Sequence, residues 1–148
     1  MQIELSKAEY RTLLGVLEIA DWVLFAHRSD KPSDRKEYHE FEQKIFACAD
    51  TFGFGHLIEY VEMHRKYFPT AEYEENSPVR AFIDEFEDHN FWTELVDRLA
   101  MRDMFRELGP ERVQAMDVRE RLTRRLDYEN RYDEEFQRHG LERLAIRE

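Results

Sequence analysis

The sequence predicts a mainly α protein, a single-domain helical bundle of five to seven helices over residues 1–148. Glycine and proline together number only nine (5 + 4) among the 148 residues, fewer than the turns of an all-β protein need. Apolar residues recur every three or four positions through most of the chain, the spacing of a helix face that packs on a core. Aromatic residues make up 14% of the chain, which is ample material for that core.

The N-terminal stretch "MQIEL", residues 1–5, alternates apolar and polar side chains and predicts a short strand. Ser6 and Glu9 then have the spacing of a capping box, which opens a helix. This helix is expected to continue to about His27 and is apolar on most of its sides. A helix of that kind is usually buried, so we expect it to be the central helix of the bundle.

Two more helices are predicted in the next forty or so residues. Asp34 and Glu37 form a second capping box, and the apolar stripe that follows runs up to Gly53, a suitable C-terminal cap. A shorter helix is predicted from residue 55 or 56 to Pro69, because proline cannot continue a helix.

The second half of the chain begins with a clear helix start. Ser77 can cap the helix and Pro78 can occupy its first position. We expect this helix to break at His89-Asn90, so that a separate helix follows and ends before Gly109.

The last predicted helix starts at the capping box of Asp117 and Glu120, continues through Arg138 and is closed by Gly140. The tail "LERLAI", residues 141–146, alternates like a strand. Neither terminal strand has another obvious partner. We therefore predict that the N- and C-terminal segments pair as a minor two-stranded ribbon lying on the helices.

The charge of the chain excludes some classes of partner. The net charge is −11, with 33 acidic and 22 basic residues, so a nucleic acid or an anionic membrane is not expected to bind. The longest apolar run is "WVLFA", residues 22–26, far shorter than the roughly 20 residues of a spanning helix. The N-terminus lacks the pattern of a signal peptide, and the single cysteine, Cys48, cannot form an internal disulfide. We expect a cytoplasmic protein.

Six histidines and many acids raise the question of a metal site. The Glu-x-x-His pairs of di-iron bundles and the His-Glu-x-x-His pattern of zincins are absent. Glu85 and His89 are four residues apart and share one helix face, but such a pair is ordinarily a surface contact worth about 0.2–0.5 kcal/mol. The candidate metal ligands that remain are Glu18, Asp21, His56, His64, Glu85 and His89.

Three of these candidates have alternative interpretations. His89 continues an apolar stripe, so it is either a buried imidazole tuned by a neighbouring acid or a half-buried residue at a helix end. Glu18 and Asp21 lie on the most apolar helix, where a buried carboxylate needs a partner. Partners within that helix are too distant, so we expect them to come from elsewhere or the pair to form a narrow hydrated stripe.

No catalytic or cofactor signature is complete. The Gly-x-Ser-x-Gly elbow and the glycine-rich phosphate loops are absent, so the sequence predicts no catalytic residue and no cofactor. The expected function is that of a non-enzymatic interaction or structural protein, with a protein partner or self-association, for example as a homodimer. The alternative is a metal- or small-ligand-binding bundle, or an enzyme that uses carboxylate and histidine side chains.

Overall fold

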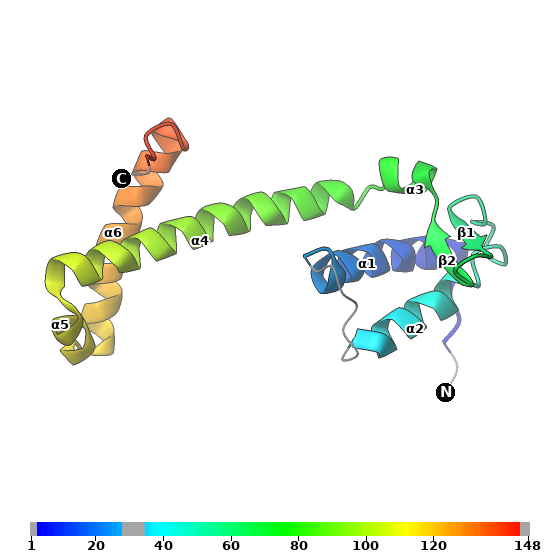
Figure 1. Cartoon of the computed structure of the whole chain (residues 1–148), viewed down its shortest axis with the longest axis horizontal. Coiled ribbons are helices and arrows are strands. Elements are labelled where there is room, and N and C mark those ends of the chain that lie inside the picture. Colours follow the sequence, from blue (N-terminus) through cyan, green and yellow to red (C-terminus); the bar gives the residue numbers. More distant parts are fainter. Residues whose placement is uncertain (1–2, 28–34, 146–148) are drawn as a thin grey trace. The chain divides into compact units, whose positions relative to one another are not determined.

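The computed structural model describes residues 3–27 and 35–145, and in these ranges the chain forms six helices and one small antiparallel sheet (Figure 1). The mainly α prediction and the expected number of helices are confirmed. The elements are α1 Lys7–Phe25, α2 Lys36–Phe46, β1 Ile58–Val61, β2 Lys66–Pro69, α3 Ala71–Glu75, α4 Arg80–Leu108, α5 Pro110–Ala115 and α6 Val118–His139.

The chain divides into two compact units, Met1–Asp84 and Glu85–Glu148. Helix α4 begins in the first unit and continues through the second. A single domain over the whole chain stays a prediction. None of the helices in the described ranges is long and apolar enough to cross a membrane.

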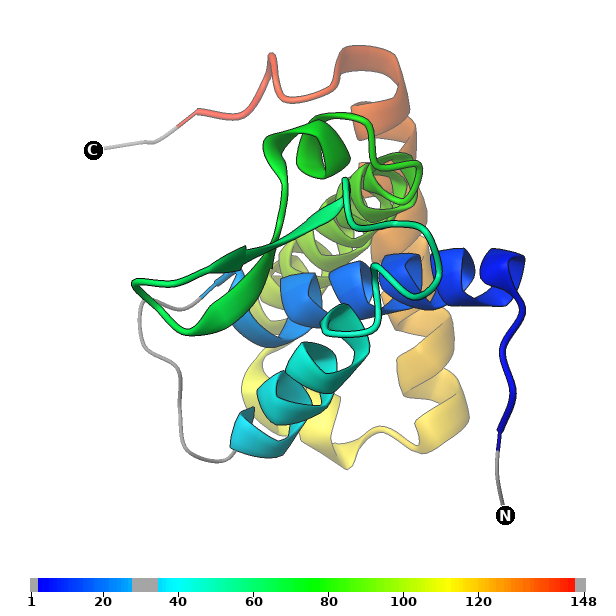
Figure 2. The same ribbon diagram turned by 90° about the vertical axis from the view of Figure 1, so that its right-hand side faces the viewer.

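The core of the first unit is built around α1. Its capping box forms as predicted, since the Glu9 amide donates to Ser6 Oγ (3.3 Å) and the Ser6 amide donates to Glu9 Oε2 (2.8 Å). One side of the helix is buried against α2, the hairpin β1–β2 and α3 (Figure 2). The buried core residues are Tyr10, Leu14, Leu17, Phe46, Ala49, Leu57, Ile58 and Tyr73.

The opposite side of α1 is exposed, which contradicts the prediction of a helix buried nearly all round. Val16 and Val23 are 54% and 59% exposed. The sequence could not show this, because an apolar side chain looks the same whether the chain covers it or leaves it at the surface.

The predicted helix from residue 55 or 56 to Pro69 is wrong. The segment forms the antiparallel hairpin β1–β2, with Ile58 opposite Pro69 and Val61 opposite Lys66. Its strands are rich in the β-branched and aromatic residues that favour sheets. The side chain of Gln43 on α2 stabilises the hairpin. It accepts a hydrogen bond from the Tyr67 amide (2.8 Å) and donates one to the Tyr67 carbonyl (2.9 Å).

Helix α2 is shorter than predicted and ends at Phe46, six residues before Phe52. The chain then turns, and the Phe54 amide donates to the Ala49 carbonyl (2.8 Å). This brings Phe52 onto the ring of Tyr10, with the ring centroids 4.2 Å apart. The expected cap Asp34 lies outside the described residues.

The predicted break at His89-Asn90 is also wrong, because α4 is continuous from Arg80 to Leu108. The span contains neither glycine nor proline, and asparagine inside a helix costs well under 1 kcal/mol. The Trp92 indole also donates to Asp88 (3.1 Å) across the expected break. Helix α4 also begins two residues later than predicted, at Arg80, and Pro78 lies in the turn before it.

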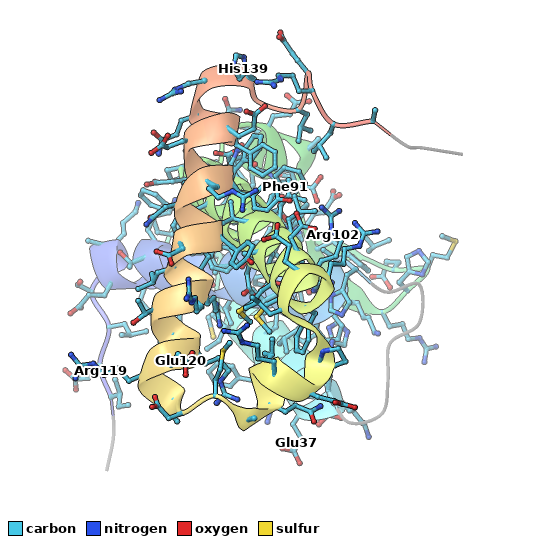
Figure 3. The ribbon with its side chains drawn as sticks, turned by 90° about the vertical axis from the view of Figure 1, so that its left-hand side faces the viewer. Glu37, Phe91, Arg102, Arg119, Glu120 and His139 are labelled. Carbon is cyan, nitrogen blue, oxygen red and sulfur yellow. The ribbon has the colours of Figure 1, made fainter. Side chains whose placement is uncertain are left out.

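In the second unit, α4 packs with α5 and α6 around a core of Ala100, Met104, Val113 and Tyr128. The predicted cap of α6 is confirmed, since Asp117 accepts from the Glu120 amide (2.8 Å), and Gly140 follows the last helical residue. Figure 3 shows Glu120 at one end of α6 and His139 at the other.

The predicted ribbon of the two chain ends does not form in the described residues. Residues 3–5 and 144–145 are neither strand nor helix, and the sheet is the internal hairpin instead; residues 1–2 and 146 lie outside the described ranges. A hairpin closed by a four-residue turn needs far less loop-closure entropy than a pairing of segments about 140 residues apart.

Candidate functional site

The first candidate site is a cavity of about 420 Å³ in the first unit. This volume is in the range of small-ligand sites. Its walls come from α1, α2, β2, α3 and the first residue of α4. The lining residues are Leu14, Glu18, Asp21, Trp22, Ala26, His39, Glu42, Gln43, Phe46, Tyr67, Phe68, Pro69, Tyr73, Glu74 and Arg80.

Glu18 and Asp21 both line this cavity and are partly buried there. Glu18 accepts a hydrogen bond from the Ser77 hydroxyl, so its partner comes from another segment, which is one of the two alternatives expected. Burial, followed by the nearby Glu18 charge, raises the pKa of the Tyr73 phenol.

A further acid in the cavity wall, Glu42, was not predicted from the sequence. His39 Nδ1 lies 3.1 Å from Glu42 Oε2, and the two side chains are only 15% and 14% exposed. The spacing His39-x-x-Glu42 was the available signal, because residues three apart share one helix face. The pair therefore brings a carboxylate and an imidazole to the same cavity as Glu18 and Asp21.

Aromatic rings and one cation complete the cavity wall. The Arg80 guanidinium lies over the ring of Trp22, with its central carbon 4.4 Å from the ring centroid. A guanidinium over an aromatic face is a cation–π contact. The cavity thus combines carboxylates with aromatic faces, the chemistry that suits an organic cation.

The other metal candidates do not line this cavity. His56 and His64 are exposed, and the His64 ring packs edge-on against Phe68 with centroids 5.7 Å apart. Glu85 and His89 are exposed on α4 in the second unit, so His89 is neither buried nor at a helix end. Among residues 3–27 and 35–145, no three His, Cys, Asp or Glu side chains gather closely enough to hold a metal ion.

The second candidate site is the exposed surface of α1. Thr12, Val16, Ile19 and Val23 follow one another at spacings of four, three and four, so they lie on one side of the helix. All four are exposed. We call this set the outer face of α1. An exposed contiguous apolar surface is typical of protein interaction sites.

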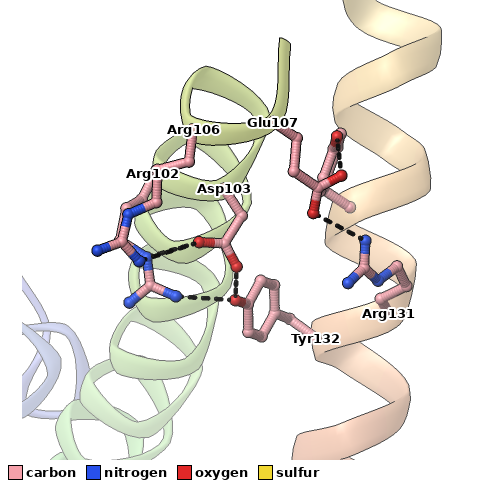
Figure 4. Close-up of polar contacts among 7 residues, drawn as sticks. Arg102, Asp103, Arg106, Glu107, Arg131 and Tyr132 are labelled. Carbon is pink, nitrogen blue, oxygen red and sulfur yellow. Dashed lines mark hydrogen bonds and ion pairs between the residues drawn. The ribbon is translucent and has the colours of Figure 1, made fainter. Parts of the chain in front are cut away.

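The second unit contains a polar cluster between α4 and α6 (Figure 4). Arg102 Nε donates to Asp103 Oδ1 (2.8 Å), and the Tyr132 hydroxyl donates to the other oxygen of Asp103. Arg102 also donates to the Tyr132 hydroxyl (3.0 Å). The hydrogen bonds from Arg102 and Tyr132 lower the pKa of the Asp103 carboxyl to about 2. The hydrogen bonds to Tyr132 connect α4 with α6, so the cluster has a structural role.

The lowered pKa of Asp103 predicts that the second unit loses stability in acid. The folded state holds this carboxyl ionised down to about pH 2, whereas the unfolded chain protonates it near 3.8. The stabilisation is complete above about pH 5 and is lost as the pH falls through about 4 to 2. Asp103→Asn should destabilise the unit at neutral pH and progressively less as the pH falls. Urea unfolding followed by Trp92 fluorescence, in a Trp22→Phe background, measures the difference.

The control for this experiment is Asp127→Asn, which removes an exposed carboxylate from α6. Its effect at neutral pH should be within about 0.5 kcal/mol. A difference between Asp103→Asn and the parent protein that stays constant from neutral to acid pH would contradict the titration of Asp103 in this window.

Comparison with known proteins yields no matching family model, no matching curated protein and no matching solved structure. The functional proposals below therefore depend on the residues and geometry of this chain alone.

Proposed function

We propose that this protein is a non-enzymatic interaction protein that binds a protein partner through the outer face of α1. One observation carries the proposal. The outer face presents four exposed β-branched side chains without an intervening charge on that side of the helix, in a chain whose residues are 37% charged. Covering these side chains with a partner would remove them from water and so favour binding.

The net charge supports a protein as the partner, and the cysteine content supports a cytoplasmic location. A net charge of −11 opposes binding to nucleic acid, which leaves a protein as the favoured macromolecular partner. The one cysteine, Cys48, is a free and exposed thiol, which agrees with a reducing cytoplasm.

Site-specific photo-crosslinking in the source cells tests the proposal. A benzophenone amino acid is placed at Val16 in one variant and at Glu62, an exposed residue of the hairpin turn, in a matched control. We expect adducts to a second protein chain at position 16 and few at position 62. Equal labelling at both positions, or no intermolecular adduct at position 16, would contradict the proposal.

The cavity favours a second function, the binding of a small organic cation. Its volume and its carboxylates, Glu18, Asp21 and Glu42, support this alternative. Thermal unfolding is measured with a panel of organic amines and diamines. A ligand at 100 times its dissociation constant should add about 2.7 kcal/mol of stability, and Glu18→Gln should reduce that gain. The absence of any shift across the panel would contradict this alternative.

A further inference from the structure

We infer that the outer face of α1 binds the same face of a second copy of this chain, with the two α1 helices antiparallel. This inference rests on the proposed function and names the partner of that same site. Steps of four, three and four residues are those of side chains that interlock between two paired helices.

The spacing is also self-complementary. In an antiparallel pair centred between residues 17 and 18, Val16 lies opposite Ile19 of the second copy, and Thr12 lies opposite its Val23. Every position of the outer face therefore meets another position of the outer face. This is the property that a two-fold interface requires, because one patch must match itself.

The charge of Glu9, near the N-terminal end of this side of the helix, favours the antiparallel arrangement. At 1.5 Å per residue, Glu9 lies about 13 Å from the centre. Antiparallel pairing therefore places the two Glu9 residues at opposite ends of the interface. Parallel pairing would place Glu9 beside Glu9, and like charges repel.

The neighbouring segment widens the surface into a shallow groove of about 340 Å³. Gly15 lets this segment approach α1 closely, because a Cβ at this position would lie 2.9 Å from Val79 Cγ1. Beyond it, the ring of Phe82 is 62% exposed and forms the far wall of the groove. Side chains of the second copy's α1 can thus pack against Phe82 as well as against the outer face.

The area of the outer face indicates how tightly the two copies are expected to bind. A helix of 19 residues is about 28 Å long and about 10 Å wide. The area of one side of such a helix is smaller than the roughly 800 Å² that each partner buries in a standard interface. The dimer should therefore be weak, and its population should rise with protein concentration.

Sedimentation equilibrium of the full chain over a wide concentration range measures this association. We expect the mass to rise from one chain toward two. Val16→Lys should raise the dissociation constant about tenfold or more, since it places a charge on each side of the axis. The matched control is Val118→Lys on α6, where the valine has a similar exposure of 63% against 54%. This control should associate like the parent protein.

Disulfide trapping tests the orientation and does not depend on a disruptive substitution. In a Cys48→Ser background, Thr12→Cys and Val23→Cys are prepared separately and then mixed under mild oxidation. Antiparallel pairing predicts a linked dimer in the mixture and little in either variant alone, because the two copies of residue 12 lie at opposite ends. A linked dimer of the Thr12→Cys variant alone would overturn the antiparallel arrangement.

The outcomes separate this inference from the proposed function. A chain that stays monomeric at every concentration overturns the second copy as partner. If position 16 then still forms adducts to a different protein in cells, the interaction function stands with another partner. If position 16 forms adducts only within its own chain, both proposals fail.

Discussion

Tyr10→Ala is expected to lower the free energy of unfolding of the first unit by about 3–5 kcal/mol. The Tyr10 side chain is fully buried, and its ring stacks on Phe52 in a nearly parallel arrangement. Its hydroxyl donates to the Ile45 carbonyl (2.6 Å), and burial raises the pKa of the phenol to about 12. Alanine removes the ring from the centre of the core and also removes this hydrogen bond, so that only the Cys48 amide still donates to the Ile45 carbonyl (3.0 Å).

Urea unfolding followed by Trp22 fluorescence, in a Trp92→Phe background, measures this loss. The chain has two tryptophans, so each unit keeps one reporter. Tyr10→Phe keeps the ring and should cost only about 1 kcal/mol, the usual value for one hydrogen bond. Tyr38→Ala, at an exposed tyrosine of α2, should change stability by about 0.5 kcal/mol or less. A similar loss in all three variants would contradict the central role of the Tyr10 ring.

Met104→Ala is the second large prediction and concerns the second unit. Met104 is completely buried, in the cluster with Ala100, Val113 and Tyr128. Truncation to alanine leaves a cavity and should lower the free energy of unfolding by about 2–5 kcal/mol. Unfolding followed by Trp92 fluorescence, in the Trp22→Phe background, provides the measurement.

The matched control for Met104→Ala is Met104→Leu. Leucine nearly preserves the volume, so the loss should stay below about 1.5 kcal/mol. If leucine is as damaging as alanine, the shape of the side chain rather than its buried volume decides the packing at this site. That result would contradict the cavity explanation.

Local signals in the sequence predicted several elements correctly. The N-terminal caps at Ser6 and Asp117 were recognisable because each side chain accepts from the backbone amide only three residues further on. An outside partner for Glu18 was one of the two alternatives predicted, the other being a hydrated stripe, since a buried carboxylate needs a partner or water. That the partner is Ser77, 59 residues away, followed only from the fold.

The candidate site was predictable only in part. Glu18 and Asp21 were selected because they are acids on an apolar helix, and both line the cavity. The pair His39 and Glu42 was missed because its burial depends on how α2 lies in the unit. His89 was considered as a buried or half-buried histidine because it continues an apolar stripe. It is exposed, because burial depends on which other segments pack against that stripe.

The sequence by itself determined the helical class, the capped starts of α1 and α6 and the acidic character of the chain, because these depend on composition and on neighbours within a few residues. Only the tertiary structure decided that residues 58–69 form a hairpin, because Gln43 on α2 bonds both backbone groups of Tyr67. It also decided which side of α1 is covered. Local sequence specifies that a side chain is apolar, and burial is set by what the rest of the chain brings against it.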